Sequence, residues 1–244
     1  MHFTSPHLLA HGVVERHFTL GDIPGILWTP SSTPAPLILM GHPGGLEGMH
    51  PRLSARALAS AELGFATATI ELPGGGERPR DPEMDRARAD LHQALRSGSP
   101  LGDIVERLVL PLVEQAVPEW QRALDALLGL PDIGGPIGYS GGPIAVGVRL
   151  AAVDHRIAAA GLFAGSYVPR TTFDEARTIT IPLHVLLQWD DEGNDRQLAL
   201  DLFDAFASTE KTLYASLGGH RGVPPQAGED AARFFARHLA PRED

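Results

Sequence analysis

Hydrophobic and polar residues follow two different periods along the chain. Near the N-terminus, two alternating segments flank Gly21-Asp22, and this pattern predicts a β-hairpin over residues 13–28. Further along, short and continuously apolar runs are separated by stretches with helical periodicity. The predicted strands are 37–40, 65–72, 135–139, 158–164, 182–189 and 212–215, and the predicted helices are 51–63, 112–128, 144–152, 195–207 and 228–239. Alternation of buried strands with helices predicts an α/β fold, a doubly wound and mostly parallel sheet with the hairpin as its antiparallel edge.

The segment 78–111 departs from this alternation. It is charged and helix-prone, it is interrupted at residues 97–100, and it contains no strand candidate. Reactive groups in doubly wound sheets lie at the carboxyl ends of the strands. We therefore expect residues 78–111 to form a small helical lid over that edge, within a single domain covering residues 1–244. Arg78 and Arg80 are expected to pair with nearby acidic residues of the lid on a solvated face.

Composition and charge narrow the classes of function. The formal net charge of −10 argues against a nucleic-acid partner, which needs a basic face. No apolar run approaches the roughly 18 residues needed to cross a bilayer, and residues 1–6 do not resemble a secretory signal. The sequence has no cysteine, which excludes disulfides, thiolate metal sites and a cysteine nucleophile. We expect a cytoplasmic protein without a nucleic-acid or membrane partner.

The candidate chemistry begins with the run Gly138-Tyr139-Ser140-Gly141-Gly142, which places a serine inside G-x-S-x-G. The run lies between a predicted strand and a predicted helix, as a nucleophile elbow does. In such an elbow the chain turns sharply from strand to helix, and the serine hydroxyl projects above the sheet. A serine hydroxyl is a poor nucleophile until a base removes its proton, and the base needs an acid to orient it.

Two later loops, each directly after a predicted strand, supply a candidate acid and a candidate base. The first contains Asp190, Asp191 and Asp195, and the second contains His220 after two glycines. The resulting order of serine, acid and histidine is that of α/β-hydrolases. Loop position favours Asp191 over Asp190, while Asp190 and Asp195 could instead solvate the loop or cap the next helix.

These residues, together with Gly41-His42-Pro43-Gly44-Gly45 and Gly218-Gly219-His220, resemble the α/β-hydrolase superfamily over nearly the full chain. Within it, the chain is similar to the dienelactone hydrolase-like and acyl-esterase branch. The resemblance implies that Ser140 attacks a carbonyl as nucleophile, His220 acts as general base and then acid, and Asp191 orients the histidine. An acyl-enzyme would form, and water would release the acid.

The resemblance also implies an oxyanion hole with two N–H donors. Gly141, the residue after the serine, would supply one donor. The other would come from the loop after the strand 37–40, where Pro43 has no N–H, so Gly44 is the expected donor with Gly45 as the alternative. His42, beside these donors, is expected to be structural.

Two functions follow from these patterns. The first is a serine hydrolase that cleaves carboxylic esters of small or medium acyl substrates, with lactones or thioesters also open. The alternative is a non-hydrolytic binding or biosynthetic, cyclase-like protein on the same scaffold. The nucleotide motifs G-x-G-x-x-G and G-x-x-x-x-G-K-[ST] and the metal motif H-E-x-x-H are absent, so we expect no cofactor and no metal. The sequence does not determine the oligomeric state, and a homo-oligomer is one of the alternatives.

Overall fold

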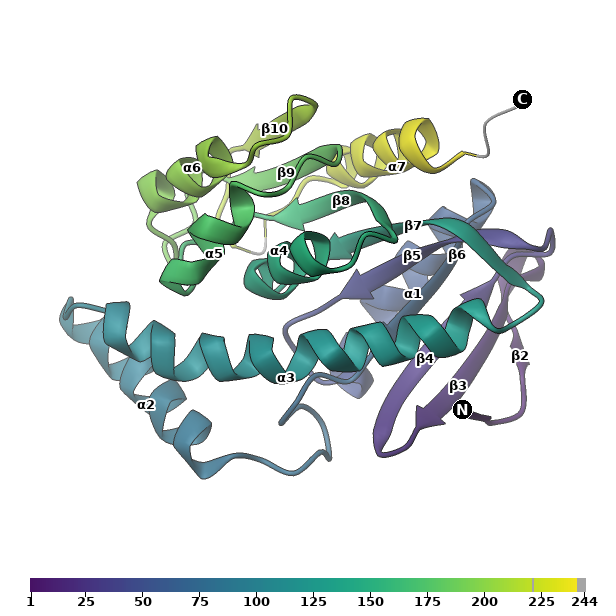
Figure 1. Cartoon of the computed structure of the whole chain (residues 1–244), viewed down its shortest axis with the longest axis horizontal. Helices are drawn as coiled ribbons and strands as arrows, with labels where there is room; N and C mark the ends of the chain where they lie inside the picture. The colour runs from purple at the N-terminus through teal and green to yellow at the C-terminus, as the bar shows by residue number, and fades with distance from the viewer. Residues whose placement is uncertain (221, 241–244) are drawn as a thin grey trace.

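A ten-stranded sheet forms the centre of the molecule in a computed structural model, which describes residues 1–220 and 222–240 (Figure 1). The strand order is β1-β3-β4-β6-β5-β7-β8-β9-β10, with β2 paired to β3. The strands are β1 (His2–Phe3), β2 (His7–Leu8), β3 (Val14–Leu20), β4 (Ile23–Thr29), β5 (Ala35–Gly41), β6 (Ala66–Ile70), β7 (Ile133–Gly141), β8 (Ile157–Phe163), β9 (Leu183–Gln188) and β10 (Lys211–Ser216). The neighbouring strands β6, β5, β7, β8, β9 and β10 run parallel to one another. The pairs formed by β1, β2, β3 and β4 are antiparallel, including the pair of β4 with β6. The predicted fold class is confirmed.

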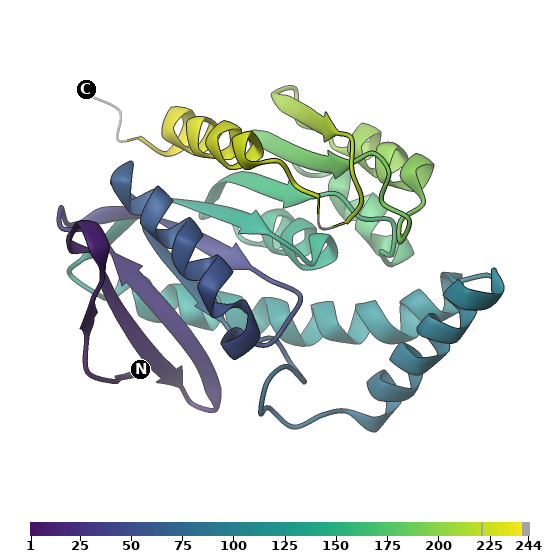
Figure 2. The same ribbon diagram turned by 180° about the vertical axis from the view of Figure 1, so that it is seen from behind.

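Helices cover both faces of this sheet. They are α1 (Leu46–Glu62), α2 (Pro82–Ser97), α3 (Gly102–Leu128), α4 (Ile144–Val153), α5 (Arg170–Ala176), α6 (Arg196–Ala205) and α7 (Pro225–Leu239), with a short 3-10 turn at Ala10–Gly12. One face carries α1 and α7 (Figure 2), and the other carries α3 to α6 (Figure 1). Because both faces are covered, all seven residues of β5 are buried. None of the described helices is long and apolar enough to cross a membrane.

The helix α3 differs most from the prediction. It runs without a break from Gly102 to Leu128 and contains both Pro111 and Pro118, so the predicted helix start at Leu112 is wrong. One apolar face continues across Pro111, with buried residues on both sides of it. Burial of that face against the sheet and α4 outweighs the cost of about 3 kcal/mol that an internal proline carries. Residues 102–111, the last part of the predicted lid, are therefore continuous with the predicted core helix 112–128.

Arg78 anchors the chain where it leaves the sheet toward α2. Its guanidinium donates to both carboxylate oxygens of Glu119 on α3, at 2.7 Å each, and to the carbonyl oxygen of Glu71 at 2.9 Å. The hydrogen bonds with Glu119 raise the pKa of Arg78. The predicted pairing of Arg78 with acidic residues of the lid is wrong, because its carboxylate partner is Glu119. Asp81, one of those acidic residues, instead caps α2 by accepting from the N–H of Glu83. The contact between Arg78 and Glu119 could not be predicted from their spacing, because they are 41 residues apart in the sequence.

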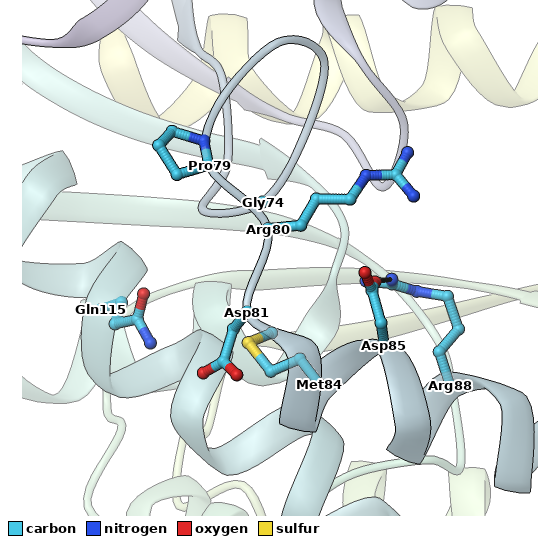
Figure 3. Close-up of a pocket in the computed structure, with 8 residues that line it drawn as sticks. All are labelled: Gly74, Pro79, Arg80, Asp81, Met84, Asp85, Arg88 and Gln115. Atoms are coloured by element: carbon cyan, nitrogen blue, oxygen red, sulfur yellow. Dashed lines mark hydrogen bonds and ion pairs between the residues drawn. The ribbon is translucent and has the colours of Figure 1, made fainter.

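Arg80 lies beside a small cavity of about 20 Å³ at the start of α2, with its guanidinium directed away from Asp81 (Figure 3). Such a cavity holds about one water molecule and no substrate. Arg80 is exposed and forms no ion pair with the described residues. It is therefore the matched control for Arg78.

Replacing Arg78 with methionine is expected to lower the free energy of unfolding by about 3 kcal/mol, because it leaves the carboxylate of Glu119 buried without its partner. The change Arg80→Met should alter it by less than about 0.5 kcal/mol. Urea unfolding of both variants measures the difference. Equal small losses would mean that the Arg78 pair contributes no net stability.

Candidate active site

The loops after β9 and β10 bring Asp191 and His220 together. The imidazole Nδ1 of His220 lies 2.8 Å from Oδ2 of Asp191. Asp191 is buried, and its carboxylate also accepts from the N–H of Gly193 at 3.0 Å and from Nδ2 of Asn194 at 2.8 Å. The imidazole packs edge-on against the ring of Phe163, with centroids 5.5 Å apart. A carboxylate held by several donors fixes the ring and leaves its Nε2 to exchange a proton.

The other two candidate acids have different partners. Asp190 is exposed, and its Oδ2 lies 3.3 Å from the N–H of Gly218. Asp195 caps α6 through the N–H of Leu198 at 3.1 Å. Of the three acids that the sequence left open, the structure places Asp191 against His220.

Ser140 has a different partner from the one expected. Its Oγ accepts from Nη2 of Arg56 on α1 at 2.9 Å, and the same Nη2 reaches the Ser140 carbonyl oxygen at 3.2 Å. Ser140 is 9% exposed and makes no hydrogen bond with His220. Asp191 is thus hydrogen-bonded to His220, as expected, whereas Ser140 is hydrogen-bonded to Arg56.

The bend between β7 and α4 explains the position of Ser140. The strand continues through Ser140 to Gly141, which still lies opposite Gly41 and Leu162 in the neighbouring strands. The backbone φ of Gly141 is 123°, and a Cβ there would lie 2.3 Å from the carbonyl oxygen of Gly41. The predicted strand end at residue 139 is wrong: the strand runs to Gly141, where the chain takes the conformation that only glycine adopts. Ser140 therefore keeps strand geometry.

Strand geometry decides which way the two side chains point. Tyr139 packs on Trp120 of α3, with ring centroids 6.2 Å apart, so Ser140 faces the opposite side of the sheet. A Cβ added at Gly161, the β8 neighbour of Ser140, would lie 3.6 Å from the Ser140 Oγ and 3.1 Å from Phe235 of α7. The hydroxyl therefore lies beneath α1 and α7.

Arg56 is the residue at this site that sequence reasoning missed. Burial, with a smaller effect of nearby Arg52, lowers the pKa of the Arg56 guanidinium to about 10, so it is still charged at pH 7. Among the described residues it forms no ion pair with a carboxylate. A cation held against the serine oxygen favours the ionised form of that hydroxyl. Arg56 lies in a helix-like stretch where nothing in the sequence marks it.

The two expected oxyanion donors follow neighbouring parallel strands. Gly44 lies in the loop after β5, and Gly141 ends β7, so both stand at the same edge of the sheet. His42 in that loop is 1% exposed, and its Nε2 lies 3.1 Å from the carbonyl oxygen of Ile70. Burial lowers the pKa of His42. Gly45 caps α1. The contacts of His42 fit the structural role expected for it.

A cavity of about 710 Å³ opens beside the Asp191 loop. The turn between α2 and α3 forms one wall with Leu101 and Val105, and the segment after β8 forms another with Tyr167 and Phe173. That segment is tied to the Asp191 loop, because the N–H and the hydroxyl of Ser166 each lie 3.0 Å from Oδ1 of Asn194. Ser140 and His220 are not among the lining residues. The cavity is adjacent to the site and does not enclose it.

Solved structures identify the fold. No protein-family model matches the chain, and no curated protein matches it by sequence. A cold-adapted esterase from an Arctic intertidal metagenomic library, in a PEG-bound complex, superposes with a TM-score of 0.76 at 25% identity, covering 98% of this chain and 100% of the esterase. The chain has the α/β-hydrolase fold, which it shares with this esterase.

Two further structures share this α/β-hydrolase fold at lower identity. A dienelactone hydrolase from Anabaena variabilis has a TM-score of 0.62 at 17% identity, covering 96% of this chain and 98% of its own. Acetyl xylan esterase 1 from Thermoanaerobacterium has a TM-score of 0.64 at 11% identity, covering 97% and 87%. Both matches span at least 96% of this chain.

Proposed function

We propose that the chain hydrolyses carboxylic esters of small or medium acyl groups. The hydrogen bond of 2.8 Å between Asp191 and His220, at the carboxyl edge of a sheet shared with esterases, carries this proposal. His220 would accept a proton through Nε2 and later return it to the leaving alcohol. Asp191 would hold the ring and stabilise the imidazolium.

Ser140 is the proposed nucleophile. Its hydroxyl must leave Arg56 and approach Nε2 of His220, a contact that catalytic groups commonly tighten only when substrate binds. Oγ then attacks the carbonyl carbon while its proton passes to His220. The N–H groups of Gly44 and Gly141 hold the oxyanion, the alcohol departs with the proton, and water releases the acid from the acyl-enzyme.

The cavity of about 710 Å³ is the proposed binding place for the part of the substrate next to the scissile ester, which itself would extend beyond the cavity to Ser140 and His220. Its walls include the apolar side chains of Leu101, Val105 and Phe173, and its volume falls within the range of small-molecule sites. The turn between α2 and α3 would then serve as the predicted lid. A small-molecule ester is the partner that this arrangement favours.

The position of Ser140 favours a second candidate function. A serine within the strand, held by Arg56, supports a non-hydrolytic binding or biosynthetic role for the scaffold. In that case Asp191 and His220 would move a proton on a bound ligand, and no covalent intermediate would form.

Two measurements on the wild-type protein separate these functions. Hydrolysis of p-nitrophenyl esters of increasing chain length tests for turnover, and a fluorophosphonate tests for an activated serine. We expect turnover with short or medium chains and one label per chain, mapped to the peptide that contains Ser140. Turnover without a label would exclude the covalent mechanism. Neither turnover nor a label in folded protein would favour the non-hydrolytic function.

A further inference from the structure

A second group of titratable side chains lies on the α1 face of the sheet, at its antiparallel end. Glu15 and His17 stand two residues apart on β3, so both side chains point to the same face. The helix α1 brings His50 over them. One ligand atom from each of the three residues lies within 4.8 Å of the others. None of these residues takes part in the proposed ester hydrolysis.

The separations of Glu15 from the two imidazoles are close to those between ligand atoms around a small metal ion. Nε2 of His17 lies 3.1 Å from Oε1 of Glu15, and Nε2 of His50 lies 3.1 Å from Oε1 and 3.0 Å from Oε2. Tetrahedral zinc, with bonds of about 2.0–2.1 Å, separates its ligand atoms by about 3.3 Å. Small side-chain movements would therefore open the group around an ion.

The environment of the Glu15 carboxylate favours binding of a cation. Glu15 is 5% exposed, and its Oε2 accepts from Nε1 of Trp28 at 2.6 Å. No lysine or arginine among the described residues pairs with Glu15. With neutral imidazoles the group carries one buried negative charge, oriented by an indole N–H in the way that outer partners orient metal ligands.

We propose that Glu15, His17 and His50 bind a zinc ion, with water in the fourth position. Two imidazoles and one carboxylate are a donor set that zinc accepts in proteins, and an open fourth position accompanies three protein ligands. Each imidazole would present the lone pair of Nε2 and carry its proton on Nδ1. The imidazoles are 47% and 37% exposed, which gives the ion a path from solvent. No local sequence pattern indicates this group, because His50 is distant in the chain from the pair on β3.

Titration of EDTA-treated and dialysed full-length protein with zinc chloride tests the site. Isothermal calorimetry should show one ion per chain, and a hundredfold excess of zinc over Kd should raise Tm by about 5 °C or more. His17→Gln and His50→Gln should each weaken binding by more than about tenfold. His11→Gln is the control, since His11 is an exposed histidine near Glu62, outside the group.

Cobalt gives a readout that does not depend on stability or on ester turnover. Co²⁺ in the site should produce the visible absorption of a tetrahedral complex in the wild type and in His11→Gln, and not in His17→Gln. Circular dichroism of the metal-free variants establishes that each is folded. Absence of zinc binding in the wild type, or undiminished binding in both His17→Gln and His50→Gln, would overturn the proposal.

Discussion

Replacing Ser140 with alanine is expected to lower kcat for p-nitrophenyl ester hydrolysis by about 10⁶-fold, as loss of the nucleophile does in serine hydrolases. Without Oγ, no acyl-enzyme can form, and His220 has no hydroxyl to deprotonate. Steady-state kinetics beside the wild type gives the ratio. Ser208→Ala is the matched control, because Ser208 is also buried but precedes β10 at the opposite edge of the sheet.

The same variant reports on the contact with Arg56. Loss of the Ser140 hydroxyl removes one acceptor from a charged donor and should lower the free energy of unfolding by about 1–3 kcal/mol. A Ser140→Ala protein that loses this stability but keeps most of its turnover would show that Ser140 is a structural acceptor for Arg56. The nucleophile would then have to be sought elsewhere, and the serine mechanism would fail.

Changing Asp191 to asparagine is expected to lower kcat by about 10⁴-fold with little change in fold. The amide keeps the size of the carboxylate, but it favours the wrong tautomer of His220 and cannot stabilise the imidazolium. Kinetics of Asp191→Asn and of Asp190→Asn make a matched comparison, since Asp190 is the exposed neighbour that bonds to Gly218. Asp190→Asn should retain wild-type turnover within about threefold.

Similar losses in the two variants would contradict the assignment. They would indicate that the negative charge of the loop as a whole, and not its contact with His220, supports turnover. Full activity in Asp191→Asn would remove the acid from the mechanism altogether.

Local patterns along the chain were sufficient to predict the framework. The apolar runs at β5 and β9 are too short for helices and too continuous for exposed strands, so their place in a covered sheet could be predicted. The loops that carry Asp191 and His220 directly follow β9 and β10, and parallel strands bring such loops to one edge. Their contact thus follows from chain order and topology.

Other features depend on contacts between distant segments. The partner of Arg78 is Glu119, 41 residues away, and the partner of Ser140 is Arg56, 84 residues away. The direction of the Ser140 side chain is set by where the strand ends, and the positive φ of Gly141 moves that end by one residue. A five-residue motif contains the serine in either case, so the motif alone could not distinguish the two geometries.

The long helix α3 has a consequence for how this protein can change during evolution. It extends past the sheet, and α2 packs mainly on that extension (Figure 1). The turn between the two helices forms a wall of the large cavity, but the sheet does not depend on it for its own packing. Changes in the turn and on the exposed face of α2, away from its buried Met84, Ala87 and Ala94, can therefore accumulate without disturbing the sheet, and they would reshape this wall of the cavity while the edge with Asp191 and His220 stays constant.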